Sequence, residues 1–350
     1  MSHDLPNTEV KPLSPSLALT SPLDYQVIQR RSSHEGIIPV AGSCNPPCER
    51  VEVGLAGGNW LTAEPDPASG DFHLDLVAPA GGWHAVHARA FMGTTIVANG
   101  KVAHVGVGEV FVGAGQSNST SCGGIGSTNR LDGRTKTLTR QVSTFDGSKW
   151  RIADDPQPGA HDGHDRGSFW PAFGDAMAAK YGVPIGVAVT GHAGTSIRQW
   201  TRRDPLFHWT LTRLCQLEPH GFRALLWHQG ENDADIGMDT HCYYDGLAEI
   251  ISDMRAEVGR DFPLFVAQAS YIPPPKNAVS PAIRTAQQLL WERGIAFEGP
   301  DTDMLLGDLR DCGGKGIHFS RKGLKVHGEA WAEKVGAWLD QLLHSEPLDH

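Results

Sequence analysis

From residue 108 onward, short apolar runs alternate with stretches of helical periodicity, and this alternation limits the choice of fold more than any other feature of the chain. Each run has the length and the small or β-branched residues of a buried strand. Strands that alternate with helices are joined by right-handed crossovers and form a parallel sheet with helices on both faces. The five runs are EVFVGAG, VPIGVAVTG, FRALLWHQG, PLFVAQAS and DMLLGDL.

The helical stretches carry their own start and stop signals. Ser280 and Ser320 stand where an N-cap side chain accepts the first free backbone N–H groups. Gly182 and Gly259 follow two further helical patterns, where a left-handed residue ends a helix. The sequence therefore predicts helices within residues 168–182, 243–259, 280–294 and 320–343.

The region before residue 108 has a different texture. Short strand-like pieces such as RVEVGLAG and FHLDLVAP are separated by turn residues, and several alternate apolar and polar side chains. No helical pattern interrupts them, which is typical of a small β-sandwich. We expect a disordered polar arm over residues 1–21, a β-sandwich over 22–107 and a three-layer α/β/α domain over 108–350.

The charge of the chain restricts its partners. A formal net charge of -10 argues against a nucleic-acid backbone or an anionic membrane surface as the main partner. We expect a small-molecule or oligosaccharide substrate; the sequence does not give the oligomeric state. The first residues lack the basic and apolar regions of a signal peptide, so we expect a cytoplasmic protein, or a secreted or periplasmic one if a leader has been removed.

The six cysteines leave two interpretations open for one pair. Cys44 and Cys48 flank an Asn-Pro-Pro turn, and they either form a small local disulfide or stay reduced. Reduced thiols fit a cytoplasmic chain better.

Polar side chains gather where the predicted strands end. Ligands of an open parallel sheet bind beyond the carboxyl ends of its strands, so these side chains should share one rim. A serine, a histidine, carboxylates, amides and glycine turns together form the inventory of a hydrolase. The strand-end residues are 115–118 after the first run, 191–195 after the second, 228–233 after the third, and Asp308, Arg310, Asp311 and His318 after the fifth.

Each of these features also has a structural interpretation. A serine after a strand is usually a turn residue or a helix cap, but Ser117 is flanked by Gln116 and Asn118 and preceded by glycines. Its turn is not a G-x-S-x-G elbow, because Ser119 stands where that motif needs glycine. The segment HDGHDRGS has the spacing of a metal site, yet we predict a solvated loop, no metal and no other cofactor.

Five segments carry a family resemblance. The block GEVFVGAGQSN resembles the nucleophile block of the SGNH-hydrolase superfamily, and with WHQGEND it resembles the branch of sialate O-acetylesterases and carbohydrate esterase family six. The blocks GHAGTSIRQW and GIHFS are similar to the glycine and histidine blocks of that branch, and LDYQVIQR to the start of its N-terminal β-domain. The resemblance implies an SGNH, flavodoxin-like fold and a metal-independent serine esterase with an acetyl-enzyme intermediate.

The resemblance also implies roles for individual residues. Ser117 would be the nucleophile and His318 the general base. The oxyanion hole would consist of the backbone N–H groups of Ser117 and Gly194 and the side-chain amide of Gln229, and each such donor is typically worth ~3 kcal/mol.

The acid of the triad is less clear, because Lys315 stands three residues before the histidine, where the superfamily has aspartate. Our first choice is Glu231, which the resemblance allows. Asp311 is the second choice, since a glycine-rich loop could fold it back, and Asp233 is the third. Glu231 could instead only brace its loop.

Six further residues are expected to bind substrate: Gln116, Asn118, Arg198, Trp200, Asp233 and Arg284. Trp200 could equally pack in the core, and Arg284 could lie on a helix surface.

The sequence thus predicts a carbohydrate O-acetylesterase acting on an acetylated sialic acid or an acetylated polysaccharide or oligosaccharide. One alternative is an esterase for short non-carbohydrate acyl esters. The other is an inactive carbohydrate-binding relative, which Lys315 at the acid position would explain.

Overall fold

The computed structural model describes residues 14–125 and 131–344, which form two compact units. Unit 1 contains the chain up to Pro22, Pro39–Leu76 and Ala85–Ala103. Unit 2 contains Leu23–Ile38, Val77–His84 and the chain from His104 onward. Because both units are discontinuous in sequence, and a compact unit is not the same as a folding domain, the expected limits 22–107 and 108–350 stay a prediction.

Unit 1 is built from antiparallel strands in two sheets. The first has the order β1-β3-β6, and in the second β5 pairs with β4, β4 with β7, and β7 with β8. Buried and more exposed side chains alternate along β3, as in the layers of a β-sandwich. The strands are β1 (Ser16–Ser21), β3 (Glu35–Asn45), β4 (Arg50–Leu55), β5 (Trp60–Ala63), β6 (Asp71–Pro79), β7 (Gly81–Met92) and β8 (Thr95–Gly115).

Two expectations for this unit can be compared with the structure. Residues 1–13 of the expected disordered arm lie outside the described residues, but Ser16–Ser21 is ordered as β1 because its backbone pairs with β3. Cys44 and Cys48 are buried free thiols with their Sγ atoms 2.7 Å apart.

The sheet of unit 2 is parallel except at one edge, as predicted. Its strand order is β10-β9-β11-β8-β12-β13-β16, and β10 alone along this path pairs antiparallel. The short β2 adds a further parallel pairing, to β8. The strands are β2 (Val27–Gln29), β9 (Val142–Phe145), β10 (Trp150–Ile152), β11 (Ile185–Val189), β12 (Ala224–His228), β13 (Leu264–Gln268) and β16 (Phe297–Asp301).

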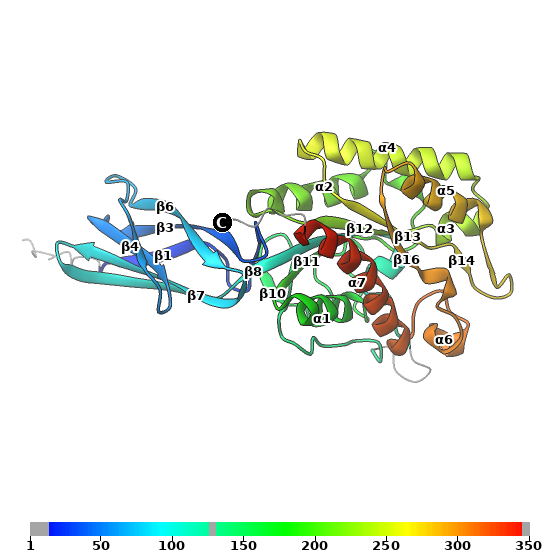
Figure 1. The fold of residues 1–350 in the computed structure, drawn as a ribbon, viewed down its shortest axis with the longest axis horizontal. Helices are drawn as coiled ribbons and strands as arrows, with labels where there is room; N and C mark the ends of the chain where they lie inside the picture. Colours follow the sequence, from blue (N-terminus) through cyan, green and yellow to red (C-terminus); the bar gives the residue numbers. More distant parts are fainter. Residues whose placement is uncertain (1–13, 126–130, 345–350) are drawn as a thin grey trace, which may run out of the picture. The chain divides into compact units, whose positions relative to one another are not determined.

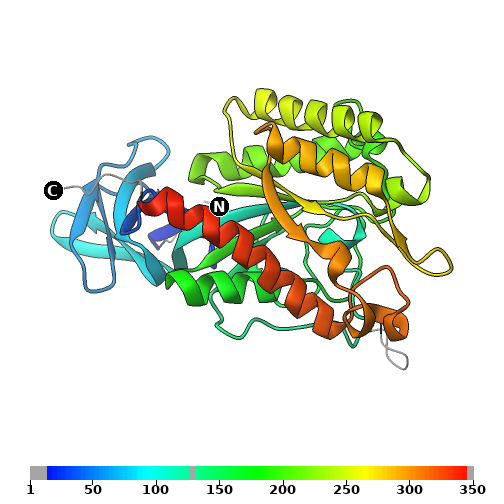
Figure 2. The same cartoon turned by 45° about the vertical axis from the view of Figure 1, so that its right-hand side comes forward.

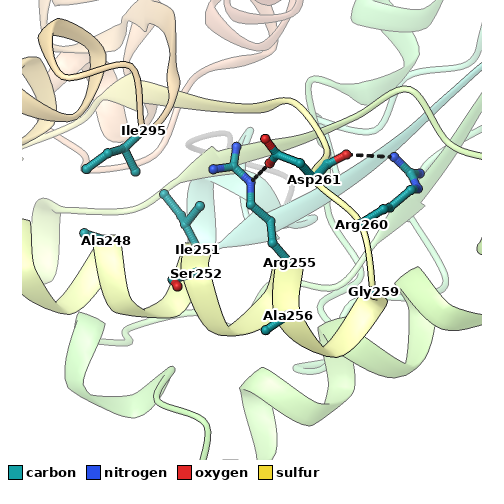
Figure 3. A pocket seen from close by; sticks show the side chains of 9 residues that line it. All are labelled: Ala248, Ile251, Ser252, Arg255, Ala256, Gly259, Arg260, Asp261 and Ile295. Carbon is teal, nitrogen blue, oxygen red and sulfur yellow. Dashed lines mark hydrogen bonds and ion pairs between the residues drawn. The ribbon is translucent and has the colours of Figure 1, made fainter.

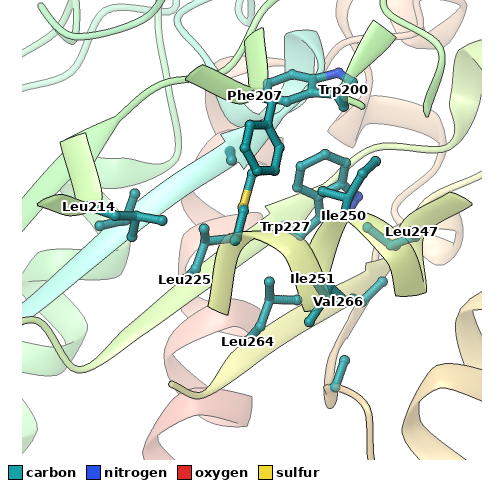
Figure 4. Packing of buried hydrophobic residues seen from close by; sticks show 14 of the residues in the cluster. Trp200, Phe207, Leu214, Leu225, Trp227, Leu247, Ile250, Ile251, Leu264 and Val266 are labelled. Carbon is teal, nitrogen blue, oxygen red and sulfur yellow. The ribbon is translucent and has the colours of Figure 1, made fainter. Parts of the chain in front are cut away.

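Helices cover both faces of this sheet (Figures 1 and 2). On one face, α1 (Trp170–Tyr181) and α7 (Arg321–His344) pack in a core that includes Phe111 of β8. On the other, α2 (Pro205–Leu217), α4 (Thr240–Val258) and α5 (Pro281–Glu292) pack in a core that includes Val112 (Figure 4 shows part of it). Adjacent residues of β8 thus face opposite cores, which explains why the run is apolar throughout.

The helix signals of the sequence are confirmed. The Oγ of Ser280 accepts the N–H of Ile283, and the Oγ of Ser320 accepts the N–H of Gly323. Gly182 and Gly259 end their helices in the left-handed conformation. No helix among the described residues is long and apolar enough to span a membrane.

The fifth predicted strand is wrong. Residues 303–309 lie in two short 3-10 turns, η4 (Thr302–Met304) and η5 (Gly307–Leu309), and the edge strand is β16 just before them. β16 reads Phe-Glu-Gly-Pro-Asp and is a strand because it pairs with β13, not because its own residues favour one.

The order of the sheet creates a topological switch point. Strands 1 to 5, numbered in sequence order, are β8, β11, β12, β13 and β16. Their order across the sheet is 2-1-3-4-5. The crevice between strands 1 and 3, here β8 and β12, is where open sheets of this kind bind ligands. The remaining short elements are η1 (Ser117–Ser119), η2 (Ile197–Gln199), η3 (Glu218–His220), α3 (Glu231–Asp235), β14 (Tyr271–Ile272), β15 (Ala278–Val279) and α6 (Asp311–Gly314).

Candidate active site

Ser117 lies in a tight turn at the carboxyl end of β8. Gly115 has φ +122°, and a Cβ there would lie 2.1 Å from the backbone oxygen of His228, so the turn needs glycine. The N–H of Gln116 donates to that same oxygen (2.9 Å), and the hydroxyl of Thr120 donates to the backbone oxygen of Ser117 (3.1 Å). These bonds hold the serine at the switch point, two residues beyond the end of β8.

A cavity of about 470 Å³ brings Ser117 and His318 together. It lies at the switch point, because its wall includes residues that follow β8 and β12. Ser117, Gly194, Glu231 and His318 all line it, so four of the predicted residues share one space although they are far apart in sequence. The full lining is Gln116, Ser117, Ala193, Gly194, Glu231, Asn232, Asp235, Ile272, Pro273, Pro274, Pro275, Lys276, Ile317 and His318.

A larger hollow of about 640 Å³ lies along the C-terminal part of α4 and the turn that follows it (Figure 3). Arg255 of this helix forms an ion pair with Asp261 (Nε to Oδ1, 2.6 Å). None of the predicted catalytic residues lines this hollow, so its size does not make it the active site.

The ring of His318 is suited to act as a neutral base. Burial lowers its pKa to about 4, against the opposing charge of Glu231, so the imidazole is uncharged at neutral pH. Its Nδ1 lies 3.8 Å from Oδ2 of Asp311. With Nδ1 toward a carboxylate, Nε2 is the nitrogen that can accept a hydroxyl proton.

The loop before His318 folds Asp311 back toward the ring. The backbone oxygen of Asp311 accepts the N–H groups of Lys315 and Gly316, and the N–H of Asp311 donates to the backbone oxygen of His318 (2.9 Å). Cys312, inside this turn, has a left-handed φ of 51°. Lys315 itself is exposed, so the residue at the usual acid position faces solvent.

Glu231, our first choice for the acid, makes its hydrogen bonds elsewhere. Its Oε1 accepts from Nε2 of His228 (3.0 Å) and Nδ2 of Asn118 (2.8 Å). Burial alone would raise the pKa of Glu231, but the charge and hydrogen bond of His228, with the Asn118 amide, lower it to about 2. Glu231 is therefore an ionised brace between β12 and the serine turn, and the contacts favour Asp311 as the acid.

Two residues outside the serine turn, Gly194 and Gln229, are predicted to donate to the oxyanion, and their contacts differ. Gly194 lines the cavity with φ +68°, and the N–H of its neighbour Ala193 donates to Oδ2 of Asp162 (2.7 Å). Gln229 is fully buried, and its amide donates to the backbone oxygen of Thr195 (3.0 Å) and to the Asp233 carboxylate. Both amide hydrogens thus have partners within the protein, and the role of Gln229 in the oxyanion hole stays a prediction.

Among the expected substrate-binding residues, Gln116 lines the cavity, and its Oε1 accepts the N–H of Asn232 (3.1 Å). Asn118 has a structural task, because its amide bridges Glu231 and the backbone oxygen of Ile317 (3.2 Å). It therefore links the serine turn to the histidine segment.

The other four expected substrate-binding residues lie off the cavity lining. Trp200 is buried in the core (Figure 4), and Asp233, also fully buried, bonds Ser196. Arg284 is paired with Asp301 and Asp303 at 2.8 Å, and Arg198 is exposed in η2. Sequence order cannot tell that these polar groups have partners within the fold.

Sequence reasoning missed part of the cavity wall. Ile272, the prolines 273–275 and Lys276 follow β13, the fourth parallel strand, and Asp235 ends α3. The triple-proline run after a buried strand was a visible turn signal at the functional end of the sheet.

The segment HDGHDRGS is not a simple solvated loop. The side chain of Asp162 is only 5% exposed, and ligand atoms of Cys122, Asp162 and His164 all lie within 4.8 Å of one another. These three residues are the group in the described part of the chain that could hold a metal ion.

Comparisons with known proteins identify the family of the chain and support its fold. The family model described as carbohydrate esterase, sialic acid-specific acetylesterase matches residues 107–336. A solved carbohydrate acetylesterase of Xanthomonas citri has 20% identity and a TM-score of 0.58, over 89% of this chain and 72% of that one. A solved protein of Arabidopsis thaliana has 18% identity and a TM-score of 0.52, over 66% and 98%. At these identities the two structures support the fold alone, and no curated sequence relative matches.

Proposed function

Because this chain belongs to the carbohydrate esterases of the sialic acid-specific acetylesterase family, we propose that it removes acetyl groups from sugar hydroxyls, with Ser117 as the nucleophile. The observation that carries the proposal is the shared cavity at the switch point, which both Ser117 and His318 line. The carboxylate of Asp311 stands behind the Nδ1 side of the ring.

The proposed reaction has two stages. Oγ of Ser117 bonds to the acetyl carbonyl carbon while Nε2 of His318 takes its proton. The C–O bond to the sugar then breaks, and the ring returns the proton to the leaving alcohol. A water molecule, deprotonated by the same ring, then attacks the carbonyl carbon of the acetyl-enzyme. The bond from that carbon to Oγ of Ser117 breaks, the ring returns the proton to Oγ, and acetate leaves. Backbone N–H groups of Ser117 and Gly194 would stabilise the oxyanion of both tetrahedral intermediates.

Replacement of the nucleophile tests this mechanism. For Ser117→Ala we expect acetate release from p-nitrophenyl acetate to fall by about 10³-fold or more, because the covalent route is lost. Ser148→Ala, at an exposed serine, is the matched control and should keep the full rate. A Ser117→Ala variant that folds and keeps its rate would disprove the assignment.

The charges of the cavity support a neutral sugar ester as the substrate. Glu231 and Asp235 contribute carboxylates to the lining, and the cation on it, Lys276, is ion-paired with Asp235 (Nζ to Oδ1, 2.7 Å). The carboxylate of a sialic acid would need a cationic partner that is not already neutralised. We therefore favour an acetylated oligosaccharide from a polysaccharide over an acetylated sialic acid.

This preference is measured by a comparison of two substrates. We expect kcat/KM for acetylated xylo-oligosaccharides to exceed that for 9-O-acetylated sialic acid by at least about tenfold, which corresponds to ~1.4 kcal/mol. A higher value for the sialic acid would reverse our choice of substrate while leaving the esterase mechanism in place.

An apolar part of the wall favours a second candidate, a short-chain esterase for other alcohols. Ile272, Pro273 and Ile317 line the cavity and could accept an acyl chain as well as a sugar ring. Rates on p-nitrophenyl acetate, butyrate and octanoate separate the two functions. An acetyl specialist should lose activity steeply with chain length, whereas equal or rising rates would favour the second candidate.

A further inference from the structure

Beyond the hydrolytic residues, three side chains with metal-ligating atoms lie close together near the serine turn. Cys122 follows the serine turn, and Asp162 and His164 lie in the loop before α1. One sulfur, one carboxylate oxygen and one ring nitrogen from them lie within 4.8 Å of one another. Nε2 of His164 is 3.8 Å from Oδ2 of Asp162, a separation from which both atoms could reach one ion with a small rotation of the ring.

The three side chains differ in depth in a way that suits an ion site with one open side. The thiol of Cys122 is buried, and the side chain of Asp162 is 5% exposed. The ring of His164 is 36% exposed at the rim. An ion could therefore enter past the histidine and keep one position for water.

The inner ligands are held in place before any ion binds. The carboxylate of Asp162 accepts the N–H of Ala193 (2.7 Å) and the N–H of His164 (3.2 Å). The hydroxyl of Thr120 lies 3.2 Å from Sγ of Cys122 and 3.4 Å from Oδ2 of Asp162, between the two. Ligating carboxylates in metal sites are commonly hydrogen-bonded in this manner, which fixes their orientation.

We propose that Cys122, Asp162 and His164 bind one divalent cation of the zinc class. Cysteine sulfur, histidine nitrogen and carboxylate oxygen are each zinc ligands, and zinc sites with three protein ligands keep the fourth tetrahedral position for water. Magnesium and calcium prefer sets made only of oxygen, so they fit this group poorly.

The proposed metal site lies next to the cavity, but its existence does not depend on the hydrolytic function. Ala193, which donates to Asp162, precedes Gly194 on the cavity wall. The proposal concerns binding alone, so its test does not depend on whether Ser117 is the nucleophile.

Cobalt(II) titration of the full chain tests the proposal, because cobalt occupies zinc sites and its thiolate complexes absorb in the near ultraviolet. We expect one equivalent to produce a thiolate-to-cobalt band, and zinc to abolish it by displacement. Cys122→Ser should lose the band. His164→Ala, at the exposed rim and therefore tolerated by the fold, should weaken binding at least tenfold.

The control addresses the other soft ligands. Cys44 and Cys48, with sulfurs 2.7 Å apart, are the obvious competitors, and the double variant Cys44→Ser/Cys48→Ser should keep the band. No band in the unaltered chain, a band that survives in Cys122→Ser, or a band lost only in the double variant would each overturn the proposal.

Discussion

At the scale of single residues, the site separates two carboxylates that look interchangeable in the sequence. Asp311 lies beside the ring of His318, whereas Glu231 bonds His228 and Asn118. Replacement of Asp311 should therefore reduce the reaction rate, and replacement of Glu231 should reduce the stability of the fold.

Replacement of Asp311 should change the pH dependence of the rate. Burial raises the pKa of Asp311 to about 6, so the group loses its charge as pH falls through 6, while His318 stays neutral down to about 4. We expect kcat/KM to fall on the acid side near pH 6, because a protonated acid no longer orients and stabilises the imidazolium. In Asp311→Asn the rate at pH 7 should drop by about 10³-fold and the step near pH 6 should vanish.

The exposed Lys315 provides the control for this measurement. Lys315→Ala should change the rate by less than about twofold, since surface groups away from the reacting atoms contribute little. An unchanged pH profile in Asp311→Asn would show that another group acts as the acid.

Replacement of Glu231 should instead change stability. Its folded pKa of about 2 lies below the ordinary value of 4.5, so the ionised group contributes stability above pH 4.5, and this contribution is lost as pH falls through about 2. We expect Glu231→Gln to lower the free energy of unfolding at pH 7 by about 3 kcal/mol. Urea unfolding at several pH values measures this, and a cost that stays constant down to pH 2 would contradict it.

The sequence predicted the members of the site better than their contacts. Ser117 and His318 were found because each follows a predicted strand or precedes a predicted helix. The hydrogen bonds of the Gln229 amide to Thr195 and Asp233 could not be predicted, because they depend on how three segments pack. Lys315 drew attention to the acid, but only the folded turn shows which carboxylate lies beside the ring of His318.

At the scale of elements, the junction between β8 and the serine turn depends on Gly115. Gly115→Ala would place a Cβ 2.1 Å from a backbone oxygen of β12, at a φ of +122° that other residues rarely adopt. We expect a loss of about 3 kcal/mol or more in the free energy of unfolding, since neither backbone can yield without moving its strand.

Gly182→Ala is the matched control for the glycine change. This glycine also has a positive φ, +67°, but nothing lies within 4 Å of a Cβ built there, so the expected cost is about 1 kcal/mol. Thermal unfolding of both variants compares them, and equal costs would show that the contact with β12 is unimportant.

The elements with strong local signals were predicted correctly, and the wrong prediction of the fifth strand has a physical cause. Four of the five apolar runs are parallel strands, since burial on both faces demands an apolar run whatever the partners are. The fifth, DMLLGDL, carries the same composition but lies in 3-10 turns, while the polar edge segment FEGPD takes its place by pairing with β13. Pairing with β13 decides which segment forms this edge strand, and the residues of the segment alone do not contain that information.

At the scale of the whole molecule, the catalytic unit reaches back before the region that matches the family. Arg30 and Arg223 both contact the buried Glu109 carboxylate at 2.6 Å, and β2 pairs with β8. A fragment of residues 108–350 lacks Arg30 and β2. We expect it to lose cooperative unfolding by circular dichroism, because removal of one partner of a buried ion pair typically costs 3–5 kcal/mol.

The full chain with Arg30→Met separates the loss of the ion pair with Glu109 from the loss of the β2 strand. If the ion pair dominates, this variant should lose most of what the fragment loses. A fragment 108–350 that unfolds cooperatively and hydrolyses p-nitrophenyl acetate at the full rate would show that the earlier segment is dispensable.

The pairing of β2 with β8 also orders events during synthesis. Val27–Gln29 emerges from the ribosome early, but its partner residues Gly106–Gly108 emerge only after the strands of unit 1. β2 must therefore wait without its β8 partner while the intervening segments are translated, and its pairing closes a long loop in the nascent chain.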